Sequence, residues 1–298
     1  MVSVCIPAYR AERFIAATIE SVLAQTSEDW ELVVIDDASP DATFAVASRY
    51  AGDPRVRLDR NATNLGPIGN WNHVVGRAQG RYVKVLCSDD LLYPDCLERQ
   101  AAALSAHPGA GMVAARRDVI DAQGRVVIAG RGLAGLSGPV DGRRALERMV
   151  EIGTTPFGEP SIVLFRTAAL REAGPFRDAY ASLADVDRYA QVLRRWDCVA
   201  IDETLGAFRV SGGSWSDRSH RVQGRNLRRL LDDLAADPAL QLPRSALWRG
   251  RAWSYVRAPA RRLVFRAAEW RATRRSATAT PPLPSRAAGC ASRRRRFR

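Results

Sequence analysis

The stretch WELVVIDDASPDAT, residues 30–43, decides the fold that this sequence predicts. Its apolar run from Trp30 to Ile35 has the length and composition of a buried strand, and the polar residues that follow mark a turn. Residues Asp41 to Arg49 then have the pattern of a helix. A buried strand, a turn and a helix in this order predict a βαβ unit of a parallel sheet.

The same alternation of short apolar runs and amphipathic stretches continues on both sides of this unit. Further strands are expected at Val2–Pro7, at Val56 and Leu58, and at Tyr82–Leu86, and further helices at Ala11–Gln25, Ile68–Ala78 and Pro94–His107. This pattern predicts an α/β fold, Rossmann-like, with a mostly parallel central sheet flanked by helices. Such sheets bind their ligands at the carboxyl ends of the strands, so the chemistry is expected there.

The second half of the chain has a less regular pattern. Strands are expected at Gly111–Ala115, Val119–Ile128, Ser161–Phe165 and near Cys198–Ile201, and a helix at Ala184–Arg195. Beyond about Pro243 the composition changes to arginine, alanine, serine and proline. That composition predicts a tail over residues 241–298 that is partly helical and then disordered.

Net charge is distributed unevenly along the chain. The whole sequence carries a formal charge of +13, but residues 241–298 contain 16 arginines and one acid, Glu269. The rest of the chain holds 29 basic and 31 acidic residues, a net charge of about −2. A near-neutral body argues against an enzyme of nucleic acid, whose catalytic surface is itself positive.

Cysteine spacing, histidine spacing and hydropathy exclude further classes of protein. The five cysteines lack a C-x-x-C pair and the three histidines lack ligand spacing, so reduced thiols are expected and a zinc site is not. No apolar run approaches the roughly 20 residues that span a bilayer. The chain opens directly on VSVCIPAY, without a charged segment or cleavage site, so a cytoplasmic location is expected.

Two pairs of adjacent acids follow predicted strands. Asp36 and Asp37 follow the strand in VVIDDASPD, and Asp89 and Asp90 follow the strand in KVLCSDDLLYPD. Neighbouring carboxylates repel each other unless something binds them. Hard divalent cations prefer carboxylate oxygens, and Mg²⁺ combines one or two of them with phosphate oxygens and water. The pairs indicate a metal and diphosphate site, although turn formation and helix capping account for single acids at such places.

Other phosphate-binding motifs are missing from the sequence. Gly66 and Gly69 form neither a G-x-G-x-x-G fingerprint nor a P-loop. The only lysine, Lys84, lies inside a predicted strand. The sequence therefore lacks the motifs that dinucleotide oxidoreductases and P-loop NTPases require.

Several spaced motifs, in a fixed order, together resemble the family 2 glycosyltransferases. They are IPAYR (6–10), SVLAQT (21–26), WELVVIDDASPDAT (30–43), NLGPIGNWN (64–72) and GRYVKVLCSDD (80–90). The match extends from Val2 to about Ser216. The resemblance implies a GT-A fold over residues 1–240, with a nucleotide-sugar half at about 1–115 and an irregular acceptor half at about 116–240. It also implies a nucleotide-sugar donor, a divalent metal (Mg²⁺ or Mn²⁺) and inversion at the anomeric carbon.

The resemblance assigns roles on the donor side. Tyr9 would stack on the base, and Asp37 would hydrogen-bond it. Asp89 would approach the ribose or the diphosphate, and Asp90 would be the principal metal ligand. The residues that the resemblance places around the nucleotide-sugar are Pro7, Ala8, Tyr9, Asp37 and Asp89.

On the acceptor side, the resemblance implies a carboxylate that removes the hydroxyl proton as the acceptor oxygen attacks the anomeric carbon. In SLADVDRYAQVLRRW, residues 182–196, Asp185 takes this catalytic role and Asp187 is the alternative. Both also suit the positive end of the predicted helix, which explains them without catalysis. Glu159, in GEPSIVLFR, either binds an acceptor hydroxyl or pairs with an arginine.

The chain departs from the family pattern at four places. Cys87 or Ser88 stands where the longer acidic motif has an additional acid, and Ala184 replaces a glutamate beside the presumed base. Ser211 replaces a histidine of the closing segment. Trp71 replaces an arginine that lies near the donor diphosphate in many relatives, and packing is its simplest role.

The expected function is transfer of a sugar from a UDP- or dTDP-linked donor to a glycan or lipid-linked acceptor in cell-surface polysaccharide biosynthesis. No nucleic-acid partner is expected. One alternative is a nucleotidyltransferase with an acidic metal site, although IPAYRAERF offers no glycine-rich basic loop for a triphosphate. Another is a non-catalytic, membrane-associated relative.

The tail suggests one further partner. Between Arg244 and Trp270, aromatic and aliphatic residues alternate with arginines. This pattern is typical of peripheral contact with the anionic inner face of the cell membrane, and a solvated basic helix followed by disorder is the alternative.

Overall fold

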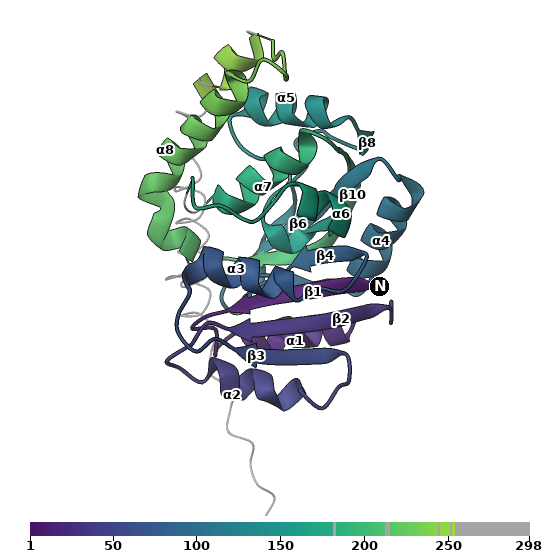
Figure 1. Ribbon diagram of the computed structural model, residues 1–298, viewed down its shortest axis with the longest axis vertical. Coiled ribbons are helices and arrows are strands. Elements are labelled where there is room, and N and C mark those ends of the chain that lie inside the picture. Colours follow the sequence, from purple (N-terminus) through teal and green to yellow (C-terminus); the bar gives the residue numbers. More distant parts are fainter. Residues whose placement is uncertain (181–182, 212–214, 244, 251, 254–298) are drawn as a thin grey trace, which may run out of the picture.

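The computed structural model describes residues 1–180, 183–211, 215–243, 245–250 and 252–253, with the side chains of 215–223 left out. Within these residues, ten strands form one mixed sheet. Its main path runs β3-β2-β1-β4-β9-β6-β10-β5, with β7 beside β6 and β8 beside β10 (Figure 1).

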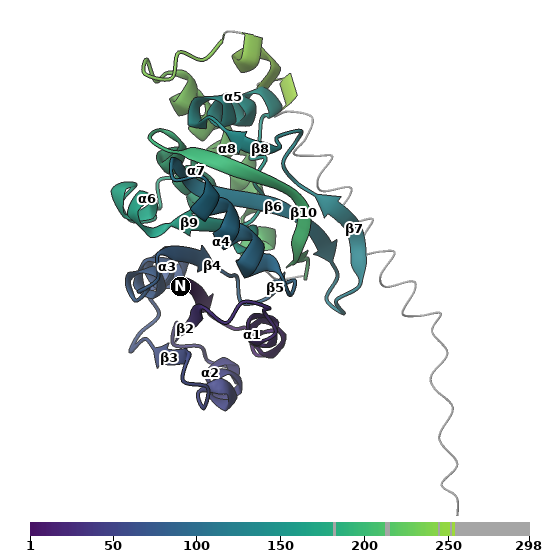
Figure 2. The ribbon, with the colours of Figure 1, turned by 90° about the vertical axis from the view of Figure 1, so that its right-hand side faces the viewer.

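The first half of the chain is a parallel sheet between two layers of helices. Its strands are β1 (Val2–Ala8), β2 (Trp30–Asp36), β3 (Val56–Arg60) and β4 (Tyr82–Val85). Its helices are α1 (Ile15–Leu23), α2 (Thr43–Ala47) with the 3-10 turn η1 (Ser48–Tyr50), and α3 (Gly66–Gly76). Figure 2 shows α1 and α2 on one face of the sheet and α3 on the other. Every residue of β1 and β2 is buried, as strands covered on both faces require.

The order of the parallel strands creates a switch point beside β1. The chain moves outward from β1 to β2 and β3, then returns to pair β4 with the other edge of β1. Helices that follow strands on the two sides of such a point diverge and leave a crevice at the carboxyl ends of the strands. Ala8 is the last residue of β1, which borders this crevice together with β4, and Asp36 is the last residue of the neighbouring strand β2.

The second half extends the same sheet with antiparallel and long parallel strands. β9 pairs antiparallel with both β4 and β6 and so joins the two halves, while β10 runs parallel to β6. The strands are β5 (Leu91–Leu92), β6 (Ala110–Ile120), β7 (Val126–Arg131), β8 (Gly138–Val140), β9 (Val163–Arg166) and β10 (Asp197–Arg209). The helices are α4 (Cys96–Ala106), α5 (Gly142–Ile152), η2 (Pro160–Ile162), α6 (Thr167–Glu172), α7 (Ala184–Leu193) and α8 (Trp215–Ala235).

Four expectations about elements need correction. The strands expected at 111–115 and 119–128 are instead one long strand, β6, followed by a turn and β7. β10 continues to Arg209, well beyond Ile201, because it pairs along most of β6. The helix expected from Pro94 begins at Cys96, and the helix expected from Asp41 is the short α2 followed by η1.

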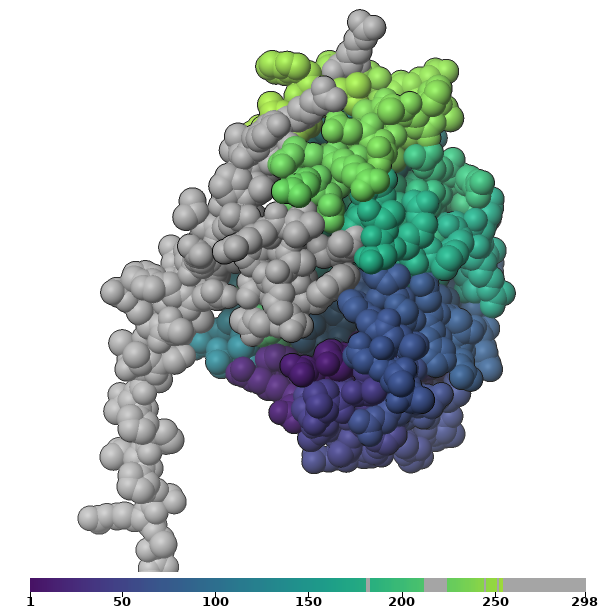
Figure 3. Space-filling view, turned by 60° about the vertical axis from the view of Figure 1, so that its left-hand side comes forward, coloured from purple at the N-terminus to yellow at the C-terminus, as the bar shows by residue number. Residues whose placement is uncertain are grey.

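The described residues show the state of four of the cysteines and the position of part of the tail. Cys5, Cys87, Cys96 and Cys198 are free thiols, as expected, and Cys290 lies outside the described residues. None of the described helices is long and apolar enough to cross a bilayer. Figure 3 shows the described end of α8 and residues 245–250 together at the end of the molecule opposite β2 and β3.

Candidate active site

The first acidic pair lies where β1 and β2 end. The backbone N–H of Asp37 donates to the carbonyl of Ala8 at 2.8 Å, which ties the two strand ends together. Asp37 is 2% exposed, and its Oδ1 accepts from Asn61 Nδ2 at 2.7 Å and from the backbone N–H of Leu65 at 2.8 Å. Tyr9, which follows Ala8, is 40% exposed. A fixed carboxylate and an exposed ring therefore border the crevice.

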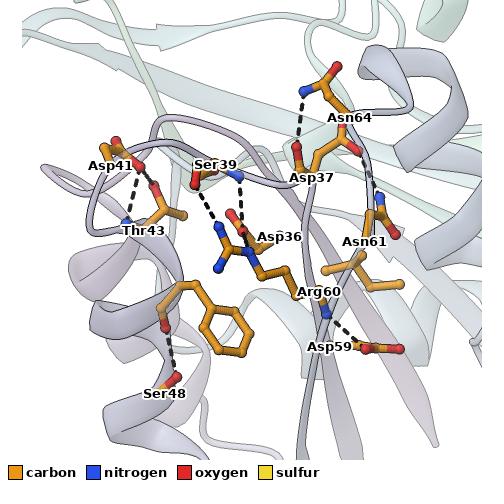
Figure 4. A network of polar contacts seen from close by, with 12 residues as sticks. Asp36, Asp37, Ser39, Asp41, Thr43, Ser48, Asp59, Arg60, Asn61 and Asn64 are labelled. Carbon is orange, nitrogen blue, oxygen red and sulfur yellow. Dashed lines mark hydrogen bonds and ion pairs between the residues drawn. The ribbon is translucent and has the colours of Figure 1, made fainter.

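The two carboxylates of this first pair have separate partners (Figure 4). Asp36 forms an ion pair with Arg60, with 3.0 Å between Oδ2 and Nε, and accepts from the backbone N–H of Ser39 at 3.1 Å. Because a cation already neutralises Asp36, the repulsion expected from the sequence is relieved inside the protein. The first pair therefore does not require a ligand for this reason.

Asparagines of the NLGPIGNWN region support Asp37, a role that the sequence did not reveal. Asn61 Nδ2 also approaches Asn70 Oδ1 at 3.2 Å, and Asn61 Oδ1 lies 2.8 Å from His73 Nδ1. Asn70 in turn donates to the carbonyl of Ile35 at 3.1 Å. The sequence feature that could have predicted this support is the number of asparagines after β3. Buried amides need hydrogen-bond partners, and they can hold a carboxylate in a fixed position.

The second acidic pair lies in a tight turn beyond the end of β4. The N–H of Asp90 donates to the carbonyl of Cys87 at 3.1 Å, and Thr18 Oγ1 on α1 donates to the carbonyls of Ser88 and Asp90 at 3.1 and 2.9 Å. Asp90 is fully buried, whereas Asp89 is partly exposed. The turn therefore presents one carboxylate to the crevice and holds the other beneath it.

Both oxygens of Asp90 accept hydrogen bonds. Oδ1 accepts from the backbone N–H of Arg209 at 2.9 Å, and Oδ2 accepts from Ser161 Oγ at 2.5 Å. Ser161 Oγ also accepts from the N–H of Cys87 at 3.1 Å. The buried ammonium of Lys84 fixes the backbone of this segment by donating to the carbonyls of Ser161 and Val163 at 3.0 and 3.2 Å. The only lysine is thus structural, and Ser161 is a site residue that sequence reasoning missed.

Burial makes the second pair electrostatically different from the first. Burial raises the pKa of Asp89 to about 6, against the lowering effect of a hydrogen bond and of Arg209. Burial, and then the neighbouring Asp89, raise the pKa of Asp90 well above its usual range. Two crowded carboxyl groups without an ion-paired cation create a place where a bound cation is favourable.

The expected base lies on the acceptor side of this turn. Asp185 is partly buried in the first turn of α7. Its charge contributes to raising the pKa of the Cys87 thiol and of the Tyr189 hydroxyl, after burial as the main cause. Because Cys87 belongs to the acidic turn, Asp185 acts electrostatically on that turn.

The other two acceptor-side candidates have arginine partners. Asp187 is fully buried, and both of its oxygens accept from Arg177, at 2.9 Å from Nε and 2.6 Å from Nη2. Glu159 forms an ion pair with Arg117, the alternative that the sequence left open. Gly158, at φ +80°, allows this pair, because a Cβ there would lie 2.7 Å from the Arg117 guanidinium carbon.

A small recess connects Glu159 to the acidic turn. Its lining includes Asp90, Arg117, Glu159, Ser161, Ala207 and Phe208. The charge of Glu159 also contributes to raising the pKa of Asp90. Glu159 is therefore part of the same electrostatic site, whatever its contact with a ligand.

One of the departures from the family pattern, Trp71, is explained by the structure. Trp71 is 8% exposed and packs edge-on against Phe176, with 5.3 Å between the ring centroids, as a packing role predicts. Ser211 is the last described residue before the gap at 212–214. Within the described residues, no group of three or more histidine, cysteine or acidic side chains is arranged as a metal site.

Comparison with known proteins places this geometry in a family. The model of glycosyl transferase family 2 matches residues 3–174. The putative glycosyltransferase EpsE of Bacillus subtilis is 32% identical over 193 residues, covering 62% of this chain and 64% of EpsE. A UDP-Glc:α-D-GlcNAc-diphosphoundecaprenol β-1,3-glucosyltransferase of Escherichia coli, WfgD, is 40% identical over 100 residues, which are 34% of this chain and 39% of WfgD. The chain therefore spans less than two thirds of the length of these relatives.

Solved structures confirm the fold. Staphylococcus aureus TarS, in complex with UDP-GlcNAc, aligns with a TM-score of 0.64 at 20% identity, covering 84% of this chain and 71% of that chain. The mannosyltransferase PcManGT of Pyrobaculum calidifontis, in complex with GDP-Man and Mn²⁺, aligns with a TM-score of 0.61 at 19% identity, covering 94% and 76%. The fold is the GT-A fold that the sequence predicted. Because the family model matches more than half of the chain, this protein belongs to glycosyl transferase family 2.

Proposed function

We propose that this protein is an inverting glycosyltransferase that moves a sugar from a nucleoside-diphosphate sugar to a hydroxyl of a glycan or lipid-linked acceptor. The observation that carries the proposal is the acidic turn at the sheet's switch point, with Asp185 acting on the pKa of Cys87 in this turn and Glu159 on the pKa of Asp90. Family membership supports the reaction class. The UDP-GlcNAc bound by TarS and the UDP-Glc donor in the name of WfgD support a UDP-linked donor.

The nucleoside end of the donor belongs at the carboxyl ends of β1 and β2. Pro7 and Ala8 end β1 and form the wall of the crevice, and the exposed ring of Tyr9 offers a face for stacking on the base. Asp37 is held by Asn61 and Leu65 in one orientation, so it is suited to read a base by hydrogen bonding. Asp36 has no part in this contact, because Arg60 occupies it.

The acidic turn suits a divalent metal with few protein ligands. Two carboxylates fit Mg²⁺ or Mn²⁺, which complete their coordination with phosphate oxygens and water. Asp89 is accessible, and Asp90 lies directly beneath it with a raised pKa. When bound, such an ion neutralises the diphosphate that leaves with the nucleoside. Ser161 and the backbone of Arg209 hold Asp90 in position for this task.

Asp185 is the residue that we assign to proton transfer. It would accept the proton of the acceptor hydroxyl as that oxygen bonds to the anomeric carbon, while the bond from this carbon to the diphosphate breaks. Asp187 is the weaker candidate, because a bidentate pair with Arg177 holds both of its oxygens. Glu159 would contact an acceptor hydroxyl from the recess beside Asp90.

A donor screen tests the proposal directly. Thermal shift with a panel of nucleoside-diphosphate sugars and Mn²⁺ should identify a donor that raises Tm, because a ligand that binds only the folded state stabilises it. Release of nucleoside diphosphate from that donor then measures turnover. The proposal fails if no donor in a panel of UDP-, dTDP- and GDP-linked sugars stabilises the protein or is turned over.

A described part of the tail supports peripheral membrane contact. Residues 245–250 are helical and pack on the end of α5: Ala246 is buried, and a Cβ on Gly250 would lie 1.9 Å from the carbonyl oxygen of Val150. Arg249 pairs with Glu151 at 3.1 Å. This docking leaves Trp248 76% exposed. We propose that this face meets anionic lipid, with aromatic and arginine anchors.

Flotation with vesicles tests this contact. The full-length protein should float with vesicles that contain anionic lipid and remain unbound with neutral vesicles. Trp248→Ala should reduce the floated fraction severalfold at unchanged Tm, because the side chain is exposed and supports no packing. Equal flotation of the variant and the wild-type protein would refute a membrane contact through this helix.

A further inference from the structure

Two arginines that are far apart in the sequence, Arg13 and Arg209, both contact the ring of Phe14. The guanidinium carbon of Arg13 lies 5.0 Å from the centroid of the Phe14 ring, and that of Arg209 lies 4.8 Å from the same centroid. Phe14 directly precedes α1, and Arg209 is the last residue of β10. The topology therefore brings two cations together at the carboxyl edge of the sheet, in the loop that follows β1.

Arg209 also holds the acidic turn in place. Besides the bond from its backbone to Asp90, its Nε donates to the carbonyl of Asp89 at 2.8 Å and its Nη1 donates to the carbonyl of Asp121 at 3.1 Å. These two side-chain bonds go to neutral main-chain oxygens. The guanidinium is therefore fixed beside the acidic turn while its charge remains available to a further anion.

The charges of the two arginines oppose each other. Their guanidinium carbons lie 5.0 and 4.8 Å from the same ring centroid, so two positive charges share one small region. In the part of the chain that the structure describes, neither guanidinium forms an ion pair with a carboxylate. Gathering two such cations costs electrostatic energy unless an anion binds between or beside them.

Three other residues of the site do not supply this charge. Trp71 is buried against Phe176, and the ammonium of Lys84 is buried under the acidic turn in bonds to two carbonyls. Arg60 is engaged by Asp36. Arg13, in contrast, is exposed, and Phe14 supports its guanidinium from the side by a cation–π contact.

We infer that Arg13 and Arg209, which both contact the Phe14 ring, bind the diphosphate of the donor. They would bind it from the side opposite the acidic turn. Guanidinium groups bind phosphate oxygens through two parallel hydrogen bonds, which suits a group that must be held and then released as a leaving group. Asp89 and Asp90 would approach the diphosphate through a cation, and the two arginines would approach it directly. This inference rests on the proposed nucleotide-sugar function.

The test compares a nucleotide with its nucleoside in the absence of divalent metal. Calorimetric titration of full-length protein with UDP and with uridine, in EDTA, measures the two affinities separately. Arg13→Ala should weaken UDP binding about tenfold and leave uridine binding unchanged, since the lost contact is charge-assisted and goes to phosphate. Raising NaCl should weaken UDP binding more steeply in the wild-type protein than in the variant.

Two further variants make the result specific. Arg49→Ala removes the same charge from an exposed arginine in η1, away from the carboxyl edge, and should bind UDP as the wild-type protein does. Arg209→Lys keeps the charge and the backbone bond to Asp90, but a lysine cannot form the two parallel hydrogen bonds of a guanidinium group. This variant should therefore also have a lower affinity for UDP and an unchanged affinity for uridine.

Three outcomes are informative. Wild-type affinity for UDP in Arg13→Ala, or an equal loss of UDP and uridine, overturns the inference and leaves the proposed function standing. Selective loss of UDP supports it. If wild-type protein binds no nucleotide, the same titrations with inorganic pyrophosphate still report on the arginine pair, while the proposed function itself fails.

Discussion

The two acidic pairs of this protein have the same sequence, Asp-Asp after a buried strand, and different environments. Asp36 and Asp37 have separate partners, a cation for the first and neutral hydrogen-bond donors for the second. Asp89 and Asp90 have no cation at ion-pair distance among the described residues, and burial raises both of their pKa values. A cation therefore neutralises one carboxylate of the first pair and, among the described residues, neither carboxylate of the second.

This difference shows that a dipeptide motif acquires its chemistry from the groups that surround it. At the end of β2, Arg60 reaches back from β3 and neutralises Asp36. At the acidic turn, Ser161 and a backbone N–H orient Asp90 without neutralising it. A hydrogen bond from a neutral donor fixes a carboxylate while leaving it most of its attraction for a cation.

Removing Asp90 should have the largest effect. We expect Asp90→Ala to lower sugar transfer by about three orders of magnitude or more, because both the metal contact and the order of the turn depend on it. Transfer assays and Mn²⁺-dependent nucleotide titrations measure the two losses. The matched control is Ser161→Ala, which removes one hydrogen bond to Asp90 and keeps the carboxylate, and should retain metal-dependent binding. Wild-type turnover in Asp90→Ala would refute its role.

Removing Asp185 should show that neither pair transfers the proton. Asp185→Ala should lower kcat by about 10²–10⁴-fold, the usual contribution of a general base, and leave donor binding unchanged. Asp187→Asn is the control, and we expect it to lower Tm more than it lowers kcat, because it breaks the ion pair between the buried Asp187 and Arg177. A larger loss of kcat in Asp187→Asn than in Asp185→Ala would exchange the two roles.

Removing Asp37 should affect the nucleoside end alone. Asp37→Ala loses a charge-assisted contact to the base, so we expect about a tenfold weaker affinity for nucleoside and nucleotide alike. Metal affinity in the presence of pyrophosphate should not change. Titrations with uridine and pyrophosphate separate the two effects. An equal loss of affinity for pyrophosphate would contradict the assignment of Asp37 to the nucleoside end.

Acid should weaken the second pair. Burial raises the pKa of Asp89 to about 6, so this carboxyl gains its proton as the pH falls through that value. A protonated carboxyl does not attract a cation, so Mn²⁺-dependent nucleotide affinity should be complete above pH 7 and fall up to about tenfold per unit below pH 6. Asp89→Asn should lose this pH dependence. An unchanged pH profile in that variant would assign the titration to another group.

Removing Asp36 should have the smallest functional effect. We expect Asp36→Ala to lower the free energy of unfolding by about 1–2 kcal/mol, because it breaks an ion pair that is partly exposed on the arginine side. Donor affinity should stay within about twofold of the wild type. Chemical denaturation and UDP titration measure both quantities. A selective loss of donor binding would mean that Asp36 contacts the nucleoside as well as Asp37.

The parallel half of the fold was predictable from the sequence because its strands are buried on both faces. Strands such as Trp30–Asp36 then appear as mostly apolar runs, and the turn after each strand marks its end. The long strands β6 and β10 were only partly predicted, since they carry charged residues such as Arg116 and Asp202 at one edge. Their extent is set by pairing with each other, which no local pattern encodes.

The candidate site was predictable only as far as its carboxylates. Asp37, Asp89, Asp90 and Asp185 have a motif context, but Ser161 and Arg209 act through bonds across the sheet, and their spacing in the sequence carries no signal. The ion pair that occupies Asp36 was equally invisible, because Arg60 lies on a different strand.

The most direct test of the account is the release of nucleoside diphosphate from a stabilising sugar donor, measured with Mn²⁺ and with EDTA in wild-type protein and in Asp90→Asn. The account predicts turnover in the wild-type protein with Mn²⁺, and background release both in EDTA and in the variant. Equal turnover in all three cases, or no turnover in the wild-type protein with any donor, would contradict it.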